Sequence, residues 1–115
     1  MTIAQEITQA RKLITGRLNW IKGDFERDGA HCAIGAVEEF RTKRRTLPYL
    51  FNALPKKFRN PKVTDLWEMQ DEVIRFNDAK KTRKRQVLRM FDRAAQLAQQ
   101  TKGNRKLLVI RATEA

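Results

Sequence analysis

Apolar side chains recur every three or four positions between residues 87 and 98, where Val87, Phe91, Ala94 and Ala98 share one side of a helical projection. This period is typical of an α-helix that packs one face against other apolar side chains. The opposite side carries arginines, which would remain in water. The segment therefore predicts a long amphipathic helix, and a chain built around it must fold by packing helices together.

Two further signals define the N-terminal part of the chain. Thr2 followed by Gln5 is a capping-box pattern, and the apolar residues that follow keep helical spacing until Gly16. We therefore expect a first helix that starts at Ile3 and ends at Gly16. The helical period is lost over residues 17–30, where turn residues predict a loop or a short hairpin.

The middle of the chain predicts three shorter helices. The first starts near Ala30 and presents small apolar residues up to Phe40. The second has two turns, begins around Thr46 and Pro48, and is closed by Pro55.

The third of these helices is expected to have Thr64 as its cap and Asn77 as its terminator. Thr82 is then expected to cap the long final helix. Trp20 and Trp67 both flank apolar stripes, so we expect them in the core or at its rim.

The length of 115 residues fits one domain with a modest core. We predict an all-α fold, a compact bundle of four to five helices over residues 1–103 with an extended tail over residues 104–115. The apolar run from Leu107 to Ile110 has the composition of a strand, and we expect it to pair with residues 18–21 or with a second chain, which would form a homodimer. This run is the longest apolar stretch and is far shorter than the roughly 20 residues that span a bilayer, so no membrane partner is expected.

The single cysteine and the single histidine stand side by side as Cys32 and His31. One cysteine cannot form an internal disulfide, which favours a reducing cytoplasm. Adjacent helical residues do not face each other, so His31 is badly placed as a base for a Cys32 nucleophile, and two ligands are fewer than zinc takes. We therefore predict no catalytic residue and no metal site, and interpret Cys32, Gly35 and Ala36 as small residues that allow another helix to cross closely.

The Asn77–Asp78 pair between two predicted helices has either a catalytic or a structural interpretation. We favour the structural one, in which these side chains bond free backbone N–H groups in the opposed turn of residues 29–32.

The charge of the chain is strongly positive, with 25 Lys and Arg against 13 Asp and Glu and a formal net charge of +12. The bases are concentrated, because residues 41–62 carry eight bases and no acid, and residues 80–93 carry seven bases and one acid. A solvated surface alone does not require this clustering. A surplus of this sign attracts polyphosphates and other acidic partners.

Three cations, Arg83, Lys84 and Arg85, fall at the predicted start of the final helix. That end of a helix carries the positive pole of the dipole, so each cation there is unfavourable by about 0.3 to 1 kcal/mol. Cations kept against local stability indicate another use, such as binding phosphate.

Several short motifs resemble a family of small bacterial and phage proteins that is catalogued as a domain of unknown function. The motifs are W..G at Trp20 and Gly23, C-A-x-G-A at residues 32–36, F-N-D at residues 76–78, and Thr82 followed by Val87. The resemblance covers about residues 3–98 and leaves the tail outside. It implies a fold and an association with phages or mobile elements, but no activity.

These observations lead to the hypothesis of a nucleic-acid-binding protein, for DNA or RNA, that contacts the phosphate backbone and needs no cofactor. The predicted contacts are Arg41, Lys43, Arg44, Arg45, Lys56, Lys57, Arg59, Arg83, Lys84, Arg85, Arg89 and Arg93. No helix-turn-helix or zinc-finger pattern is present, so sequence-specific recognition is not expected. A protein-interaction module or inhibitor that binds an acidic host protein is the alternative, and a cysteine-dependent enzyme is a third class.

Overall fold

A computed structural model of the chain describes residues 1–100, and this part is mostly helical. Its elements are α1 (Ile3–Thr15), β1 (Glu26–Arg27), β2 (Ala30–His31), α2 (Ala33–Glu39), α3 (Lys43–Asn52), the 3₁₀ helix η1 (Lys56–Phe58), α4 (Leu66–Asp78) and α5 (Lys84–Gln100). The compact all-α fold is confirmed. The predicted end of the final helix at Gly103 and Asn104 and the extended tail lie outside the described residues.

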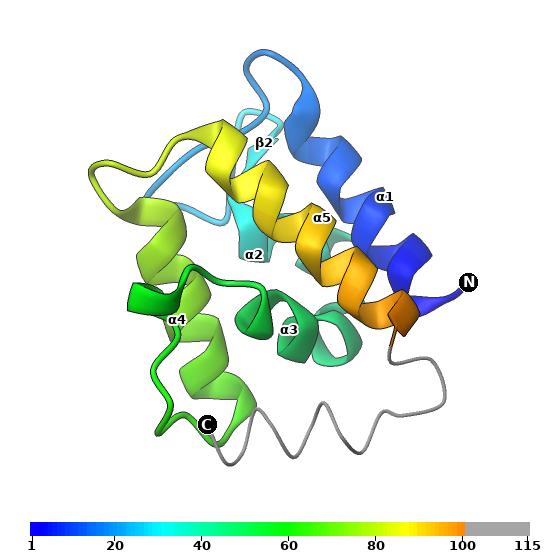
Figure 1. Ribbon diagram of the computed structural model, residues 1–115. Coiled ribbons are helices and arrows are strands. Elements are labelled where there is room, and N and C mark those ends of the chain that lie inside the picture. The colour runs from blue at the N-terminus through cyan, green and yellow to red at the C-terminus, as the bar shows by residue number, and fades with distance from the viewer. Residues whose placement is uncertain (101–115) are drawn as a thin grey trace.

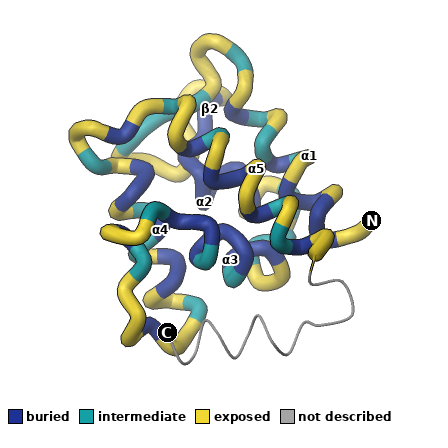
Figure 2. Tube along the Cα trace, in the orientation of Figure 1, coloured by how far each residue is buried: buried dark blue, intermediate teal, exposed yellow. Residues whose placement is uncertain are grey.

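Helices α1 and α5 lie side by side, α3 packs against α5 and α4, and α2 packs against α1 and α4, with the hairpin at one end (Figure 1). Helix α5 packs most extensively on α1, and α3 contacts both α4 and α5. The buried parts of all these helices face the centre of the molecule (Figure 2). The apolar stripe of α5 is confirmed, because Val87, Phe91, Ala94 and Ala98 are all buried in this core.

The hairpin that follows α1 consists of β1 and β2 joined by a two-residue turn. Asp28 and Gly29 both have positive φ, 53° and 83°, which is the backbone that a tight hairpin between twisted strands requires. Ala30 pairs with Arg27, and the chain then enters α2 at Ala33 with Cys32 as the N-cap. The hairpin prediction is confirmed, but the prediction that α2 starts near Ala30 is wrong because Ala30 belongs to the second strand.

Helix α3 begins at Lys43, three residues before the predicted start. The carbonyl oxygen of Thr42 accepts from the N–H groups of Arg45 and Thr46, which starts the helix within the basic run. Pro48 therefore lies inside α3.

Three predicted helix ends are also corrected. Asp65, not Thr64, caps α4, since its Oδ1 accepts from the Glu68 N–H at 2.8 Å. Asn77 does not terminate this helix, because α4 continues through it to Asp78. Helix α5 begins at Lys84, two residues after the predicted cap Thr82.

None of the helices in residues 1–100 is long and apolar enough to cross a bilayer.

Candidate functional site

Cys32 is a structural residue. It is 3% exposed, and its Sγ accepts from the Gly35 N–H at 3.4 Å in the N-cap of α2. Burial raises the pKa of the Cys32 thiol, which disfavours the thiolate that a nucleophile needs. His31 lies in β2 with its ring 3.6 Å from a carboxylate oxygen of Glu39, and no cluster of three or more metal-ligating side chains occurs within residues 1–100.

The close approach at Gly35 is confirmed, but the neighbour is a loop and not a helix. A Cβ at Gly35 would lie 1.9 Å from the backbone oxygen of Phe25. The same Phe25 oxygen accepts the Cys32 N–H at 3.2 Å, so the start of α2 rests directly on the segment before β1.

Asn77 joins three segments through one buried side chain. Its Oδ1 accepts from the indole Nε1 of Trp20 at 2.7 Å and from the Ala33 N–H at 3.1 Å, and its Nδ2 donates to the Ile21 oxygen at 3.0 Å. Asp78 continues this junction, because its Oδ1 accepts the Gly23 N–H at 3.0 Å. The motif residues thus form a structural junction, which supports the structural interpretation of Asn77. The N–H group that Asn77 binds belongs to Ala33, one residue beyond the expected turn of residues 29–32.

The two tryptophans differ in environment. Trp20 is half-buried at the core rim, as predicted. Trp67 is 75% exposed, so its prediction as a core or rim residue is wrong. The reason is its place on α4, whose buried side carries Met69, Val73 and Phe76.

Several predicted phosphate ligands instead hold helix ends. Arg93 donates from Nε and Nη2 to the Ala53 oxygen at 3.0 and 2.7 Å, and Arg59 donates from Nη1 to the Asn52 oxygen at 3.0 Å. Both guanidinium groups therefore cap the C-terminal end of α3, where free carbonyls and the negative pole of the dipole favour cations.

Lys84 has a similar role, since its Nζ donates to the Gly16 oxygen at the C-terminal end of α1. This contact gives a structural reason for a cation at the start of α5 and weakens the dipole argument for Lys84. The argument still applies to Arg83 and Arg85, which are exposed.

The cations at the start of α3 form a separate group. Lys43 pairs with Glu38, and Arg45 pairs with the buried Glu6 at 3.5 Å. Arg41 and Arg44 are exposed. Since α3 is about 15 Å long, this group and the cations around Ala53 lie at opposite ends of the helix.

The remaining exposed cations of η1, the α4–α5 loop and α5 form a surface that we call the cationic face. Its members are Lys56, Lys57, Lys80, Lys81, Arg83, Arg85 and Arg89. None of the seven makes an ion pair with an acidic side chain of residues 1–100. The bonds from Arg93 to Ala53 hold α5 beside the C-terminal end of α3. Because α3 leads directly into η1, the cations of η1 lie near α5.

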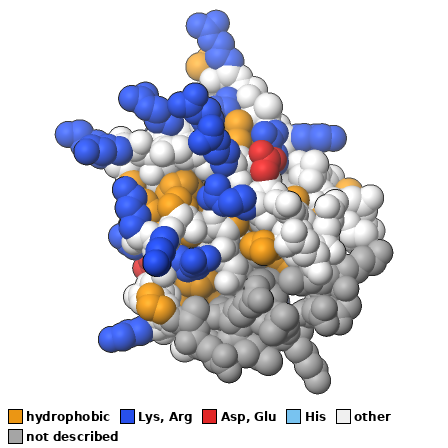
Figure 3. Space-filling model, viewed as in Figure 1, with side chains coloured by type: hydrophobic (Ala, Val, Ile, Leu, Met, Phe, Trp, Pro, Cys, Tyr) orange, Lys and Arg blue, Asp and Glu red, His pale blue; other side chains and the backbone are white. Residues whose placement is uncertain are grey.

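Basic side chains cover this side of the molecule, and few acidic ones lie among them (Figure 3). Asp92 is the single acid between residues 80 and 100, and it is already paired with Arg11 at 2.9 Å. The cationic face therefore keeps its positive charge without internal compensation from residues 1–100.

One known family covers most of the chain. The model of a family of unknown function, DUF6197, matches residues 1–97. The chain belongs to the DUF6197 family. This confirms the resemblance carried by the motifs. No curated protein and no solved structure matches the chain.

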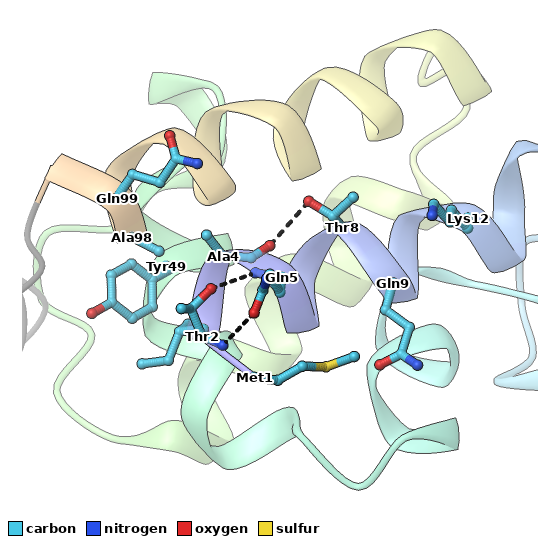
Figure 4. Close-up of a pocket in the computed structure, with 11 residues that line it drawn as sticks. Met1, Thr2, Ala4, Gln5, Thr8, Gln9, Lys12, Tyr49, Ala98 and Gln99 are labelled. Carbon is cyan, nitrogen blue, oxygen red and sulfur yellow. Dashed lines mark hydrogen bonds between the residues drawn. The ribbon is translucent and has the colours of Figure 1, made fainter.

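A groove in this DUF6197 chain, of about 890 Å³, lies beside the first turns of α1 (Figure 4). Tyr49 of α3 and Ala98 and Gln99 of α5 complete it, and Lys12 is the only charged side chain among the described residues that line it. The dashed contacts between Thr2 and Gln5 are the capping box of α1. The described lining offers neither a carboxylate nor an imidazole for acid–base chemistry.

Sequence reasoning missed Lys80 and Lys81, which precede α5 and lie on the cationic face. Their signal was present, since both belong to the basic block of residues 80–93. A helical projection of α5 does not include them, because both lie in the loop before this helix.

Proposed function

We propose that this DUF6197 protein binds the phosphate backbone of nucleic acids through the cationic face. The observation that carries the proposal is the set of seven exposed cations that lack an acidic partner within residues 1–100. Free cations of this kind neutralise phosphates and release counterions, which supplies most of the free energy of non-specific binding.

The arrangement of the cations favours contact with the backbone. Arg85 and Arg89 lie one helical turn apart on α5, about 6 Å along the axis, and both point to water. Lys56 and Lys57 add charge beside the end of α3. Contacts to phosphate position a protein without reading the bases, so we expect weak dependence on sequence.

Arg59, Lys84 and Arg93 play a smaller part in this proposal, because they already bond backbone carbonyls. Lys43 and Arg45 are also less available, because each is paired with a glutamate. The proposed site is therefore narrower than the twelve residues predicted from sequence.

The test is a binding titration of the full chain against generic duplex DNA and duplex RNA at two salt concentrations. We expect binding of both that weakens steeply with salt. No binding at low salt would reject the proposal and favour a protein partner. The choice between DNA and RNA follows from the ratio of the two affinities.

A further inference from the structure

A second surface of the molecule has the opposite charge. Trp67, Asp71, Ile74 and Asp78 are spaced four, three and four residues apart, so they share one side of α4, which we call the α4 outer face. Asp71 and Asp78 are exposed, and Trp67 is 75% exposed. A large aromatic side chain in this position is typical of an anchor for a binding partner.

Two cations beside this face are already paired with acids. Arg75 pairs with Glu72 at 2.7 Å, and Lys43, whose Nζ lies 5.8 Å from the centre of the Trp67 ring, pairs with Glu38. Asp65 and Glu68 add two acidic groups next to Trp67 in the chain. A side-chain hydrogen bond with Asp65 and the charge of Asp65 raise the pKa of the Glu68 carboxyl. The surface around Trp67 is therefore acidic in a protein of net charge +12.

The acidic character argues against a role for Trp67 in stacking on nucleic-acid bases, because phosphates would be repelled. The face instead fits a peptide segment that carries both cations and aliphatic side chains. Ile74 and Asp78 also line a cavity of about 240 Å³ with Phe25, which is 48% exposed and adds a second apolar contact.

The chain itself contains such a segment. Residues 101–115 carry four bases and one acid, and Arg105, Lys106 and Arg111 flank the four aliphatic residues from Leu107 to Ile110. We propose that this C-terminal segment docks on the α4 outer face of the same molecule, with its aliphatic residues on Trp67 and its cations beside the acids.

The length of the segment is sufficient. Ala98 near the end of α5 and Tyr49 of α3 line the same groove, and Lys43, which contacts Trp67, lies six residues before Tyr49. That stretch of α3 is about 9 Å long. Seven extended residues can span up to about 23 Å, so a segment of that length beyond Gln100 is longer than this stretch of α3.

The position of α5 also makes the predicted pairing with residues 18–21 less suitable. Helix α5 runs antiparallel to α1, because Lys84 bonds Gly16 at one end and Ala98 lies in the groove with Ile3 at the other. The C-terminal end of α5 therefore lies about 20 Å from residue 18. The backbone of Asn19 and Ile21 is already bonded to His31.

The test is acrylamide quenching of tryptophan fluorescence in the full chain. The Trp67→Phe variant gives the signal of Trp20 alone, and the difference gives Trp67. We expect quenching of Trp67 in the unaltered protein to be several-fold weaker than that of free N-acetyltryptophanamide. Changing Arg105, Lys106 and Arg111 together to Glu should restore strong quenching.

The matched control changes Lys12, Arg85 and Arg89 together to Glu, which reverses the same charge on the exposed sides of α1 and α5 and should leave Trp67 shielded. Equal effects of the two triple variants, or a Trp67 as accessible as the free indole in the unaltered protein, would overturn the proposal. Shielding that grows with protein concentration would assign the face to the segment of a second copy and also overturn it. These measurements contain no nucleic acid, so their outcome is independent of the proposed function.

Discussion

Arg41 has a backbone conformation that costs free energy. Its φ is 56°, and it occupies the position after the end of α2 where the Arg41 N–H bonds the Glu38 oxygen and the Thr42 N–H bonds the Val37 oxygen. These two bonds define a helix-ending motif in which glycine is the usual residue. An arginine at this position therefore carries backbone strain that a glycine would avoid.

We therefore predict that Arg41→Gly raises the free energy of unfolding by roughly 1 kcal/mol, because glycine adopts this φ without strain. Denaturant unfolding measures the change. Arg41→Ala is the control, since it removes the same side chain and keeps the strain. Equal stability of the glycine and alanine variants would contradict this account.

Position 35 requires glycine because there is no space for a side chain, and not because of its backbone φ angle. We predict that Gly35→Ala destabilises the protein by roughly 1–3 kcal/mol, since the new methyl group would meet the backbone of Phe25. Gly16→Ala is a suitable comparison, because its Cβ would meet only the flexible side chain of Asn19. Thermal unfolding should therefore show a much larger loss for position 35, and similar losses would reject this explanation.

At the scale of the elements, the sequence predicted best where local signals determine the structure. The capping box of Thr2, the apolar stripe of α5 and the Asp28–Gly29 turn all depend on nearby residues. The starts of α2 and α3 were misplaced because strand pairing of Ala30 and the bonds to Thr42 decide them.

The roles of the cations were also hidden from sequence reasoning. Arg85, Arg89 and Arg93 form one regular series in the sequence, yet Arg93 alone reaches the end of α3. Only the packing of α5 against α3 distinguishes Arg93, which bonds a backbone carbonyl, from Arg85 and Arg89, which have no acidic partner within residues 1–100.

This difference gives a prediction for α5. Arg93→Gln should lower the free energy of unfolding by roughly 1 kcal/mol, because the Ala53 carbonyl loses two charged donors that are partly exposed to water. Arg89→Gln should leave stability unchanged and weaken nucleic-acid binding. Chemical denaturation and a binding titration of both variants separate the two roles, and identical behaviour would contradict the assignment.

At the scale of the whole molecule, the charge is divided between surfaces of opposite sign. The cationic face combines η1, the α4–α5 loop and α5, whereas α4 and its cap carry five acids against one base. A uniform excess of positive charge would attract nucleic acid in any orientation. The division predicts that binding depends on the cationic face and not on net charge alone.

The most direct measurement is the salt dependence of duplex DNA binding by two triple variants of equal charge. The first changes Lys57, Arg85 and Arg89 to Gln on the cationic face, and the second changes Lys12, Arg17 and Arg44 to Gln elsewhere on the exposed surface. We expect the first variant to bind more weakly at every salt concentration, with a salt slope smaller by up to about 0.9 for each phosphate that the protein no longer neutralises. Equal affinities and equal slopes for the two variants would show that only bulk charge matters, which would contradict a phosphate-binding site on the cationic face.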